Sequence, residues 1–231
     1  MNKFTAIVLA AGSGKRMEQA VPKQYMDICG KPLMAYCLET FQKSQVTEIV
    51  VVVAPGEIDY VKHNIIEKYG ITKTVAIVEG GEERYNSVYA GLSAVNGGYV
   101  LIHDCARPFV SVDIIHRCMS SVTLYESCVV GMPTKDTVKL ADTKRKVLST
   151  PDRATTWIVQ TPQCFEYELI KGAYDKLIAV ADTSITDDAM VVEKATDHSV
   201  HMIEGSYTNV KITTPIDVAF AEAVIKTSTQ I

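Results

Sequence analysis

Short runs rich in valine and isoleucine alternate with segments of helical periodicity along most of this chain. The valine-rich and isoleucine-rich runs are found at residues 5–9, 49–53, 75–78, 99–103 and 128–132. Segments in which apolar residues recur every three or four positions lie at 33–41, 88–95 and 114–122. Continuous apolar strands separated by helices predict a mostly parallel sheet with helices on both faces, which is a doubly wound α/β fold.

The composition is typical of a globular enzyme of ordinary charge. A chain of 231 residues can bury a sizeable core, and we expect a single domain spanning 1–231. Its 23 Lys and Arg residues against 27 Asp and Glu residues give a net charge of −4, so we expect no nucleic-acid partner. Cationic loops on a mildly acidic body indicate a small anionic ligand instead.

The cysteines and the apolar runs bear on the compartment. The six cysteines are scattered, with no C-x-x-C pair and no zinc-ligand spacing, which favours a reducing compartment. The apolar run at 4–11 is short for a signal peptide and is soon followed by Lys15 and Arg16, so it predicts a buried first strand. No apolar stretch is long enough to span a bilayer. We therefore expect a cytoplasmic protein with no membrane partner.

One segment departs from the α/β alternation. Residues 133–160 are polar and β-branched, carry a basic turn at 144–146 and show no helical period. This pattern predicts a long β-hairpin that projects from the body as an arm. The α/β pattern resumes at Phe165, and we expect a last strand at 210–213 and a final helix capped by Thr214.

The first predicted strand runs into a glycine-rich loop at 10–17. Gly12 and Gly14 allow backbone N–H groups to approach phosphates closely. The cations that can neutralise phosphate charge are Lys15, Arg16 and Lys23. The loop is not a Walker A motif, because Leu9 stands where that motif needs glycine, nor a dinucleotide fingerprint, because Met17 replaces its third glycine. It predicts a phosphate site of another type.

Other polar segments also follow predicted strands. The turn at 80–84, with Ser87 after it, can present backbone amides and a hydroxyl to a base or ribose, although alone it also fits an ordinary turn. Asp104 and Arg107 can hold a ribose or metal and a phosphate, or they can form a structural ion pair. Because ligands of such folds bind at the carboxyl ends of the strands, these segments are expected to converge on one crevice.

Three further positions leave alternatives open. Cys105 invites a nucleophile hypothesis, but no histidine has an obvious partnering role. Lys211 alternates with apolar neighbours on its predicted strand, so it is either exposed or in the crevice. The segment 186–189 is typical of a helix cap.

Taken together, the motifs resemble those of the 2-C-methyl-D-erythritol 4-phosphate cytidylyltransferase family of the non-mevalonate isoprenoid pathway. The resemblance covers essentially the whole chain. Its motifs are Ala-Ala-Gly-x-Gly-x-Arg-Met, Pro-Lys-Gln-Tyr, Gly-Gly-x-Glu-Arg, His-Asp-x-Ala-Arg-Pro, Asp-Thr-Val-Lys, Thr-Pro-Gln, Thr-Asp-Asp-Ala and Lys-Ile-Thr-x-Pro-x-Asp. One departure is Cys105, where family members often carry alanine or glycine.

The resemblance implies a nucleotidyltransferase, Rossmann-like variant of the doubly wound sheet, with the arm pairing two subunits into a homodimer. It places the triphosphate of CTP on Gly12, Gly14, Lys15, Arg16 and Lys23. It places cytosine and ribose on Ala10, Ala11, Gly81, Glu82, Ser87 and Asp104. It places the sugar-alcohol phosphate on Arg107, Thr161, Thr186 and Lys211, with Thr137 and Arg153 supplied by the other subunit.

The chemistry that the resemblance implies needs no general base, because the substrate phosphate is already an anionic nucleophile. Arg16 and Lys23 are expected to stabilise charge in the transition state, and Arg153 and Lys211 to position the incoming phosphate. Mg²⁺ is the expected cofactor, bridging triphosphate oxygens, with no protein ligand assigned to it.

Three other functions are compatible with parts of the sequence. A ribitol 5-phosphate cytidylyltransferase has the same chemistry but tends to show Ala-Gly-Gly in the first loop, whereas this chain has Ala10-Ala11-Gly12. A non-catalytic nucleotide-binding module is expected to have lost some of the cations, and all are present here. A related metal-dependent glycosyltransferase needs an Asp-x-Asp motif, which the sequence lacks.

Overall fold

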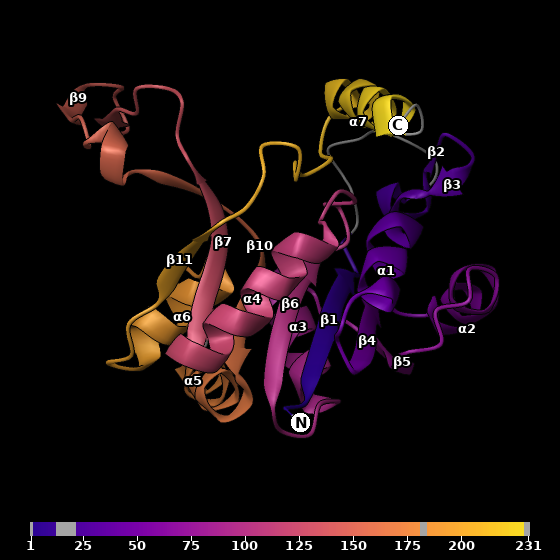
Figure 1. The fold of residues 1–231 in the computed structure, drawn as a ribbon. Helices are drawn as coiled ribbons and strands as arrows, with labels where there is room; N and C mark the ends of the chain where they lie inside the picture. The colour runs from indigo at the N-terminus through magenta and orange to yellow at the C-terminus, as the bar shows by residue number, and fades with distance from the viewer. Residues whose placement is uncertain (1, 13–21, 181–183, 229–231) are drawn as a thin grey trace.

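The structure is a computed structural model that describes residues 2–12, 22–180 and 184–228. Seven strands form one sheet in the order β11-β7-β10-β6-β1-β4-β5 (Figure 1). Their bounds are β1 Phe4–Ala10, β4 Glu48–Val53, β5 Thr74–Glu79, β6 Tyr99–Asp104, β7 Ser127–Pro133, β10 Trp157–Glu166 and β11 His201–Glu204. All neighbouring pairs are parallel except those of β10, which is antiparallel to β6 and β7. The predicted mostly parallel sheet is confirmed.

Helices cover both faces of this sheet. On one face lie α1 (Leu33–Lys43), α4 (Val112–Tyr125) and the short α2 (Ile58–Val61), which continues as a π-helix at Lys62–Glu67. On the other face lie α3 (Arg84–Ser93), α5 (Tyr167–Val180) and α6 (Asp188–Ala195). The last helix, α7 (Pro215–Ser228), packs instead with the small hairpin of β2 (Asp27–Ile28) and β3 (Lys31–Pro32).

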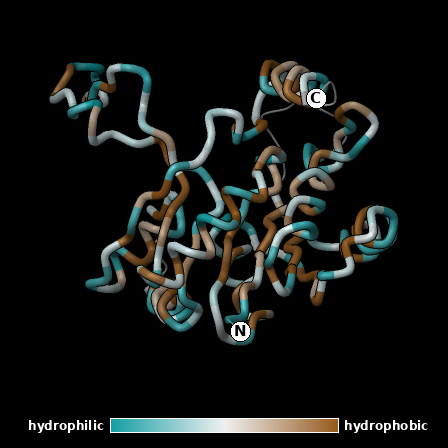
Figure 2. Tube along the Cα trace, viewed as in Figure 1, coloured by the Kyte–Doolittle hydropathy of each residue, from teal (hydrophilic) through white to brown (hydrophobic). Residues whose placement is uncertain are grey.

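Strand β1 lies between the two main hydrophobic cores. All seven of its residues are buried. Ala6 and Val8 join the core under α1 and α4, whereas Ile7 and Leu9 join the core under α3. Figure 2 shows the hydrophobic character of the central strands against the more polar outer segments. A continuous apolar run is therefore the correct signal for this strand, because it contacts protein on both faces.

The predicted strand at 210–213 is wrong. This segment is irregular, and the last strand is β11 at the sheet edge, beside β7. Ile212 is nevertheless buried, and its N–H donates to the Ala106 carbonyl oxygen at 2.8 Å. The apolar residues of the segment thus reflect burial between α7 and the end of β6 and not membership of a sheet.

The arm leaves the sheet between β7 and β10 and projects away from the body (Figure 1). It contains an antiparallel pair, β8 (Leu140–Ala141) with β9 (Val147–Ser149), and a 3₁₀ turn at Arg153–Thr155. The prediction of a projecting hairpin is confirmed. The returning strand rejoins the main sheet at Trp157, which pairs with Pro133, slightly before the expected end of the arm near 160.

Close contact between α3 and the sheet requires a glycine. A Cβ atom on Gly91 would lie 2.5 Å from Ile7 Cγ2 and 3.0 Å from Val52 Cγ2. In contrast, a Cβ atom on Gly172 in α5 would meet nothing within 4 Å.

We predict that Gly91→Ala lowers the free energy of unfolding by about 1–3 kcal/mol, the usual cost of overpacking. The matched control Gly172→Ala should raise it by about 0.5–1 kcal/mol, because alanine restricts the unfolded chain more than glycine does. Urea unfolding followed by circular dichroism measures both. Equal effects of the two substitutions would show that α3 does not depend on this close contact.

Candidate active site

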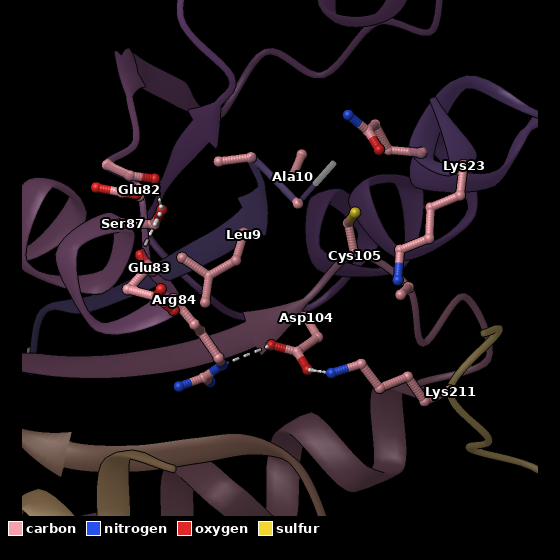
Figure 3. Close-up of a pocket in the computed structure, with 15 residues that line it drawn as sticks. Leu9, Ala10, Lys23, Glu82, Glu83, Arg84, Ser87, Asp104, Cys105 and Lys211 are labelled. Atoms are coloured by element: carbon pink, nitrogen blue, oxygen red, sulfur yellow. Dashed lines mark hydrogen bonds and ion pairs between the residues drawn. The ribbon is translucent and has the colours of Figure 1, made fainter. Parts of the chain in front are cut away.

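Two cavities open at the carboxyl ends of the strands. The first has a volume of about 280 Å³ and lies between the end of β1, the start of α3 and the end of β6 (Figure 3). The second, of about 320 Å³, lies between the end of β6, strand β10 and the start of α6. The two cavities share three lining residues, Arg84, Asp104 and Lys211. A charged wall therefore separates two adjoining binding spaces.

The end of β1 forms one side of the first cavity through Ala10, Ala11 and Gly12. Small side chains here leave the backbone open to a ligand. The remainder of the predicted phosphate loop, which includes Gly14, Lys15 and Arg16, lies outside the described residues.

Lys23 reaches the first cavity from a 3₁₀ turn, Lys23–Tyr25. The Tyr25 N–H donates to the Pro22 carbonyl oxygen at 2.9 Å, and the Tyr25 hydroxyl donates to Glu57. Gln24 is buried. The turn is thus held on both sides of the lysine, and Figure 3 shows the Lys23 side chain extending towards Cys105. Lys23 thus lines the same cavity as the end of β1.

The turn before α3 caps that helix and also lines the first cavity. Glu83 caps the helix, and its side chain and that of Asn86 form a reciprocal capping box. Gly81, Glu82 and Ser87 also line the first cavity. The turn is therefore a helix cap that also forms part of the wall of the first cavity.

Asp104, at the end of β6, is held by two cations. Its Oδ1 accepts from Arg84 Nε at 3.2 Å, and its Oδ2 accepts from Lys211 Nζ at 2.7 Å. Burial alone would raise the pKa of Asp104, but the charges of Arg84 and Lys211 outweigh it and hold the pKa well below its usual range. The carboxyl group is therefore ionised at neutral pH.

Arg107 does not pair with Asp104 through its side chain, so the structural ion pair considered from the sequence is wrong. Its guanidinium donates to the carbonyl oxygens of Asn209 at 2.8 Å and Val159 at 3.3 Å. Burial lowers the pKa of Arg107; the nearby charge of Asp104 opposes this effect and that of Arg84 adds to it. Arg107 lines the second cavity, where its guanidinium is in hydrogen-bond contact with neutral carbonyl oxygens and with no carboxylate of the described residues.

His103 and Thr161 form a hydrogen-bonded chain with the backbone at the end of β6. Because a carbonyl oxygen can only accept, the contact of His103 Nε2 with the Arg107 oxygen (3.0 Å) places the ring proton on Nε2. Nδ1 then accepts from the Thr161 hydroxyl at 3.1 Å, and that hydroxyl accepts from the Asp104 N–H at 3.1 Å. Burial lowers the pKa of His103 to about 4, so the ring is neutral at neutral pH.

The second cavity gathers the other residues predicted to meet the acceptor. Arg107, Thr161, Thr186 and Lys211 all line it. Thr186 is exposed just before α6, whose first turn is capped by Asp187, as the sequence predicted for this segment. Lys211 is in the crevice, which resolves the alternative that its sequence position left open.

Two predicted acceptor residues lie elsewhere. Thr137 and Arg153 are both exposed on the arm, and neither lines either of the two cavities described above. Their assignment to a partner's site stays a prediction.

Arg84 of the charged wall, and Asp188 and Tyr174 behind it, had no predicted role in the site. Arg84 was part of a recognised motif, but its partner could not be read from the sequence. Its Nη1 and Nη2 donate to the two carboxylate oxygens of Asp188, both at 2.8 Å, and Asp188 also accepts from the Tyr174 hydroxyl at 2.7 Å. The only available signal was the pair of acidic residues at the predicted helix cap.

The described residues of the first cavity offer few protein ligands for a metal ion. No group of three His, Cys, Asp or Glu side chains placed to hold a metal occurs within 2–12, 22–180 and 184–228. The carboxylates that line the first cavity are Glu82, Glu83 and Asp104, of which Glu83 caps α3 and Asp104 holds two cations. A sparse set of this kind fits Mg²⁺, which takes most of its ligands from substrate phosphates and water.

A glycine-rich strand end, a lysine beside it and a second cationic cavity define an enzyme of the nucleotidyltransferase class. The model of the family 2-C-methyl-D-erythritol 4-phosphate cytidylyltransferase matches residues 4–227. The chain belongs to this family. No helix of the described part of the chain is long and apolar enough to cross a membrane.

Individual relatives agree with this assignment. The enzyme of that name from Lachnoclostridium phytofermentans is 48% identical over 227 residues, covering 98% of this chain and 97% of the relative. The one from Lachnospira eligens is 45% identical over 225 residues, covering 96% and 99%. The crystal structure of 4-diphosphocytidyl-2C-methyl-D-erythritol synthase from Anaerococcus prevotii superposes with a TM-score of 0.85 at 32% identity, covering 97% of this chain and 96% of that one.

The place of Cys105 in the first cavity allows its chemistry to be tested. Burial raises the pKa of Cys105 to about 12, although the nearby charge of Lys23 opposes the effect, so the group is a neutral thiol at neutral pH. A thiol is a poor nucleophile compared with a thiolate.

We predict that Cys105→Ala keeps kcat within about threefold of the wild type. The smaller alanine side chain should have little effect on the rate, because the neutral Cys105 thiol forms no covalent bond with the substrate. Steady-state kinetics measures this. Intact-protein mass spectrometry during turnover provides the second measurement, and a cytidylylated wild-type protein that is absent in the variant would contradict the prediction.

Proposed function

We propose that this chain joins CTP and 2-C-methyl-D-erythritol 4-phosphate, giving 4-diphosphocytidyl-2-C-methyl-D-erythritol and pyrophosphate. The observation that carries the proposal is the pair of adjoining cavities with a shared charged wall. One cavity has the glycine-containing strand end and Lys23, which suit a nucleoside triphosphate, and the other has Arg107 and Thr186, which suit a phosphorylated acceptor. Residues 1–231 act as one catalytic domain in this proposal.

The nucleotide occupies the first cavity. Its base and ribose contact Ala10, Ala11, Gly81, Glu82, Ser87 and Asp104. Its triphosphate lies on the loop that begins at Gly12 and continues through Gly14, Lys15 and Arg16, beyond the described residues. Backbone N–H groups and fixed cations bind such an anion at little reorganisation cost, which is the arrangement that stabilises developing charge best.

The acceptor occupies the second cavity. Arg107, Thr161, Thr186 and Lys211 bind its phosphate or hydroxyl groups. A phosphate oxygen of the acceptor attacks the α-phosphorus of CTP, a P–O bond forms, the bond to the β-phosphate breaks, and pyrophosphate leaves. No proton is abstracted from the nucleophile, because the phosphate oxygen is already anionic.

The barrier to this displacement is mainly electrostatic, since two anions must meet and charge builds up around the α-phosphorus. Lys23 and Arg16 stabilise that charge, while Lys211 and Arg153 hold the attacking phosphate in line. Mg²⁺ on the triphosphate oxygens would neutralise and polarise the nucleotide. No carboxylate of the described residues is assigned to the ion.

Assembly and compartment complete the proposal. The arm exposes Leu140, Val147 and Leu148, an apolar surface that supports pairing with a second copy. In the resulting homodimer, Thr137 and Arg153 of one subunit would reach the acceptor cavity of the other. All six cysteines are free thiols, which fits a reducing compartment such as the cytoplasm.

The activity is tested by pyrophosphate release with CTP, Mg²⁺ and each candidate acceptor. We predict a higher kcat/KM for 2-C-methyl-D-erythritol 4-phosphate than for ribitol 5-phosphate. A higher value for ribitol 5-phosphate would make the chain a ribitol 5-phosphate cytidylyltransferase. No turnover with either acceptor, but tight CTP binding, would indicate a non-catalytic nucleotide-binding module.

The shared site is tested by mixing two inactive variants. Lys23→Ala should lower kcat by roughly 10²-fold or more, the scale of losing one preorganised charge stabiliser. Arg153→Ala is expected to be similarly impaired. Co-refolding the two should give about half mixed dimers, each with one intact site of two, so activity should return to roughly a quarter of wild type.

The mixing experiment has the opposite expected result if Arg153 does not act across the dimer. If Arg153 serves its own subunit, no mixed dimer contains an intact site and mixing restores nothing. Native mass spectrometry, which separates the mixed dimer from the two homodimers, confirms that exchange has taken place.

A further inference from the structure

Arg84 occupies the wall between the two cavities and uses three different nitrogens there. Its Nε donates to Asp104 Oδ1 at 3.2 Å, and its Nη1 and Nη2 donate to the two oxygens of Asp188 at 2.8 Å. The side chain thus joins α3, which carries it, to the end of β6 and to the first turn of α6. Positive and negative charges thus alternate along a charged line of four residues, Lys211, Asp104, Arg84 and Asp188. Figure 3 shows the part of this line around Asp104.

Asp188 is a fixed anchor for Arg84. Its side chain is 0% exposed and also accepts from the Tyr174 hydroxyl at 2.7 Å. Its backbone N–H donates to Gln163 Oε1 at 2.9 Å. A bidentate pair with a buried carboxylate held in this way has a defined geometry, and breaking it would strand a buried charge. Arg84 is therefore expected to stay in place when ligands bind.

Lys211 is held differently. Its side chain is 37% exposed and comes from the irregular segment after β11, and its Nζ donates to Asp104 Oδ2 at 2.7 Å. An acceptor phosphate in the second cavity must share Lys211 with Asp104 or take it away. If Lys211 were the sole counter-charge of Asp104, its departure would leave a buried carboxylate unpaired, at a cost that would oppose acceptor binding.

The other described groups that act on Asp104 do not replace Lys211. His103 is neutral, Cys105 is a thiol with a raised pKa, and Arg107 directs its guanidinium to two carbonyl oxygens. Of the two cations in contact with Asp104, Arg84 is the one that also pairs with the buried carboxylate of Asp188.

We propose that Arg84 is a positioning residue, which stays on Asp104 as a permanent counter-ion and so allows Lys211 to transfer from Asp104 to the acceptor phosphate. This inference rests on the proposed function, because the acceptor of the second cavity is assigned there. Arg84 itself makes no contact with the reacting atoms in this scheme. Its effect is on how tightly the acceptor binds.

The test measures acceptor affinity in variants of the charged line. Arg84→Met alone would strand the buried Asp188, so it is combined with Asp188→Asn, which removes both charges and keeps an acceptor for Tyr174. Calorimetry with 2-C-methyl-D-erythritol 4-phosphate is carried out with Mg²⁺ and a saturating α,β-methylene analogue of CTP, whose saturation is verified for each variant. The double variant should bind the acceptor about tenfold or more weakly, the scale of one charge-assisted hydrogen bond.

Adding Asp104→Asn distinguishes the proposal from a structural role. The neutral amide no longer retains Lys211, so the triple variant should regain most of the lost acceptor affinity. Unchanged affinity in the double variant, or no recovery in the triple variant, would overturn the proposal. Arg84→Lys keeps a cation between Asp104 and Asp188 and should lie between the wild type and the double variant.

The controls separate this test from folding and from the proposed function. Arg117→Met removes an arginine that contacts the Glu204 and Gly205 carbonyl oxygens away from both cavities, and it should bind the acceptor like the wild type. Circular dichroism and thermal unfolding verify that each variant is folded, and Arg84→Lys remains informative if the double variant does not fold. Failure of the wild-type protein to release pyrophosphate would refute the proposed function, whereas the variant series is judged only on an active wild type.

Discussion

The arrangement of the site depends on one buried carboxylate. Asp104 is 8% exposed at the end of a central strand, where an unpaired charge would be strongly destabilising. Arg84 and Lys211 neutralise it, and Arg84 is in turn neutralised by Asp188. These pairs tie together β6, α3, α6 and the segment before α7, which are far apart in the sequence. The need to balance this charge therefore places the walls of both cavities relative to one another.

The sheet explains why there are two cavities side by side. Parallel strands β1 and β6 bring their carboxyl ends together, which opens the first cavity next to the start of α3. Antiparallel β10 is inserted between β6 and β7, and its register shifts between Val159 and Gln163. The residues at this irregularity, Gln160 and Thr161, line the second cavity. The one strand of opposite direction thus supplies part of the wall of the second cavity.

Much of this could be predicted from the sequence, because the signals are local. The valine-rich runs predicted five strands, and the residues that follow those strands, such as Gly81 and Asp104, line a cavity as expected. The partner of Arg84 could not be predicted, since Asp188 lies 104 positions away. The sequence also left open an ion pair between Asp104 and Arg107, three residues on, whereas the turn after β6 directs that guanidinium towards Asn209.

The sequence by itself determined the layered fold, the glycine-rich segment after the first strand and membership of the family. These features follow from periodicity and from residue types at neighbouring positions, which act over short stretches of chain. Tertiary structure alone decided which charges are paired, that Val210 and Ile212 flank a lysine in an irregular segment and not in a strand, and that two cavities share one wall. Those outcomes depend on distance and burial, because a buried charge takes whichever counter-ion the packed elements bring within reach.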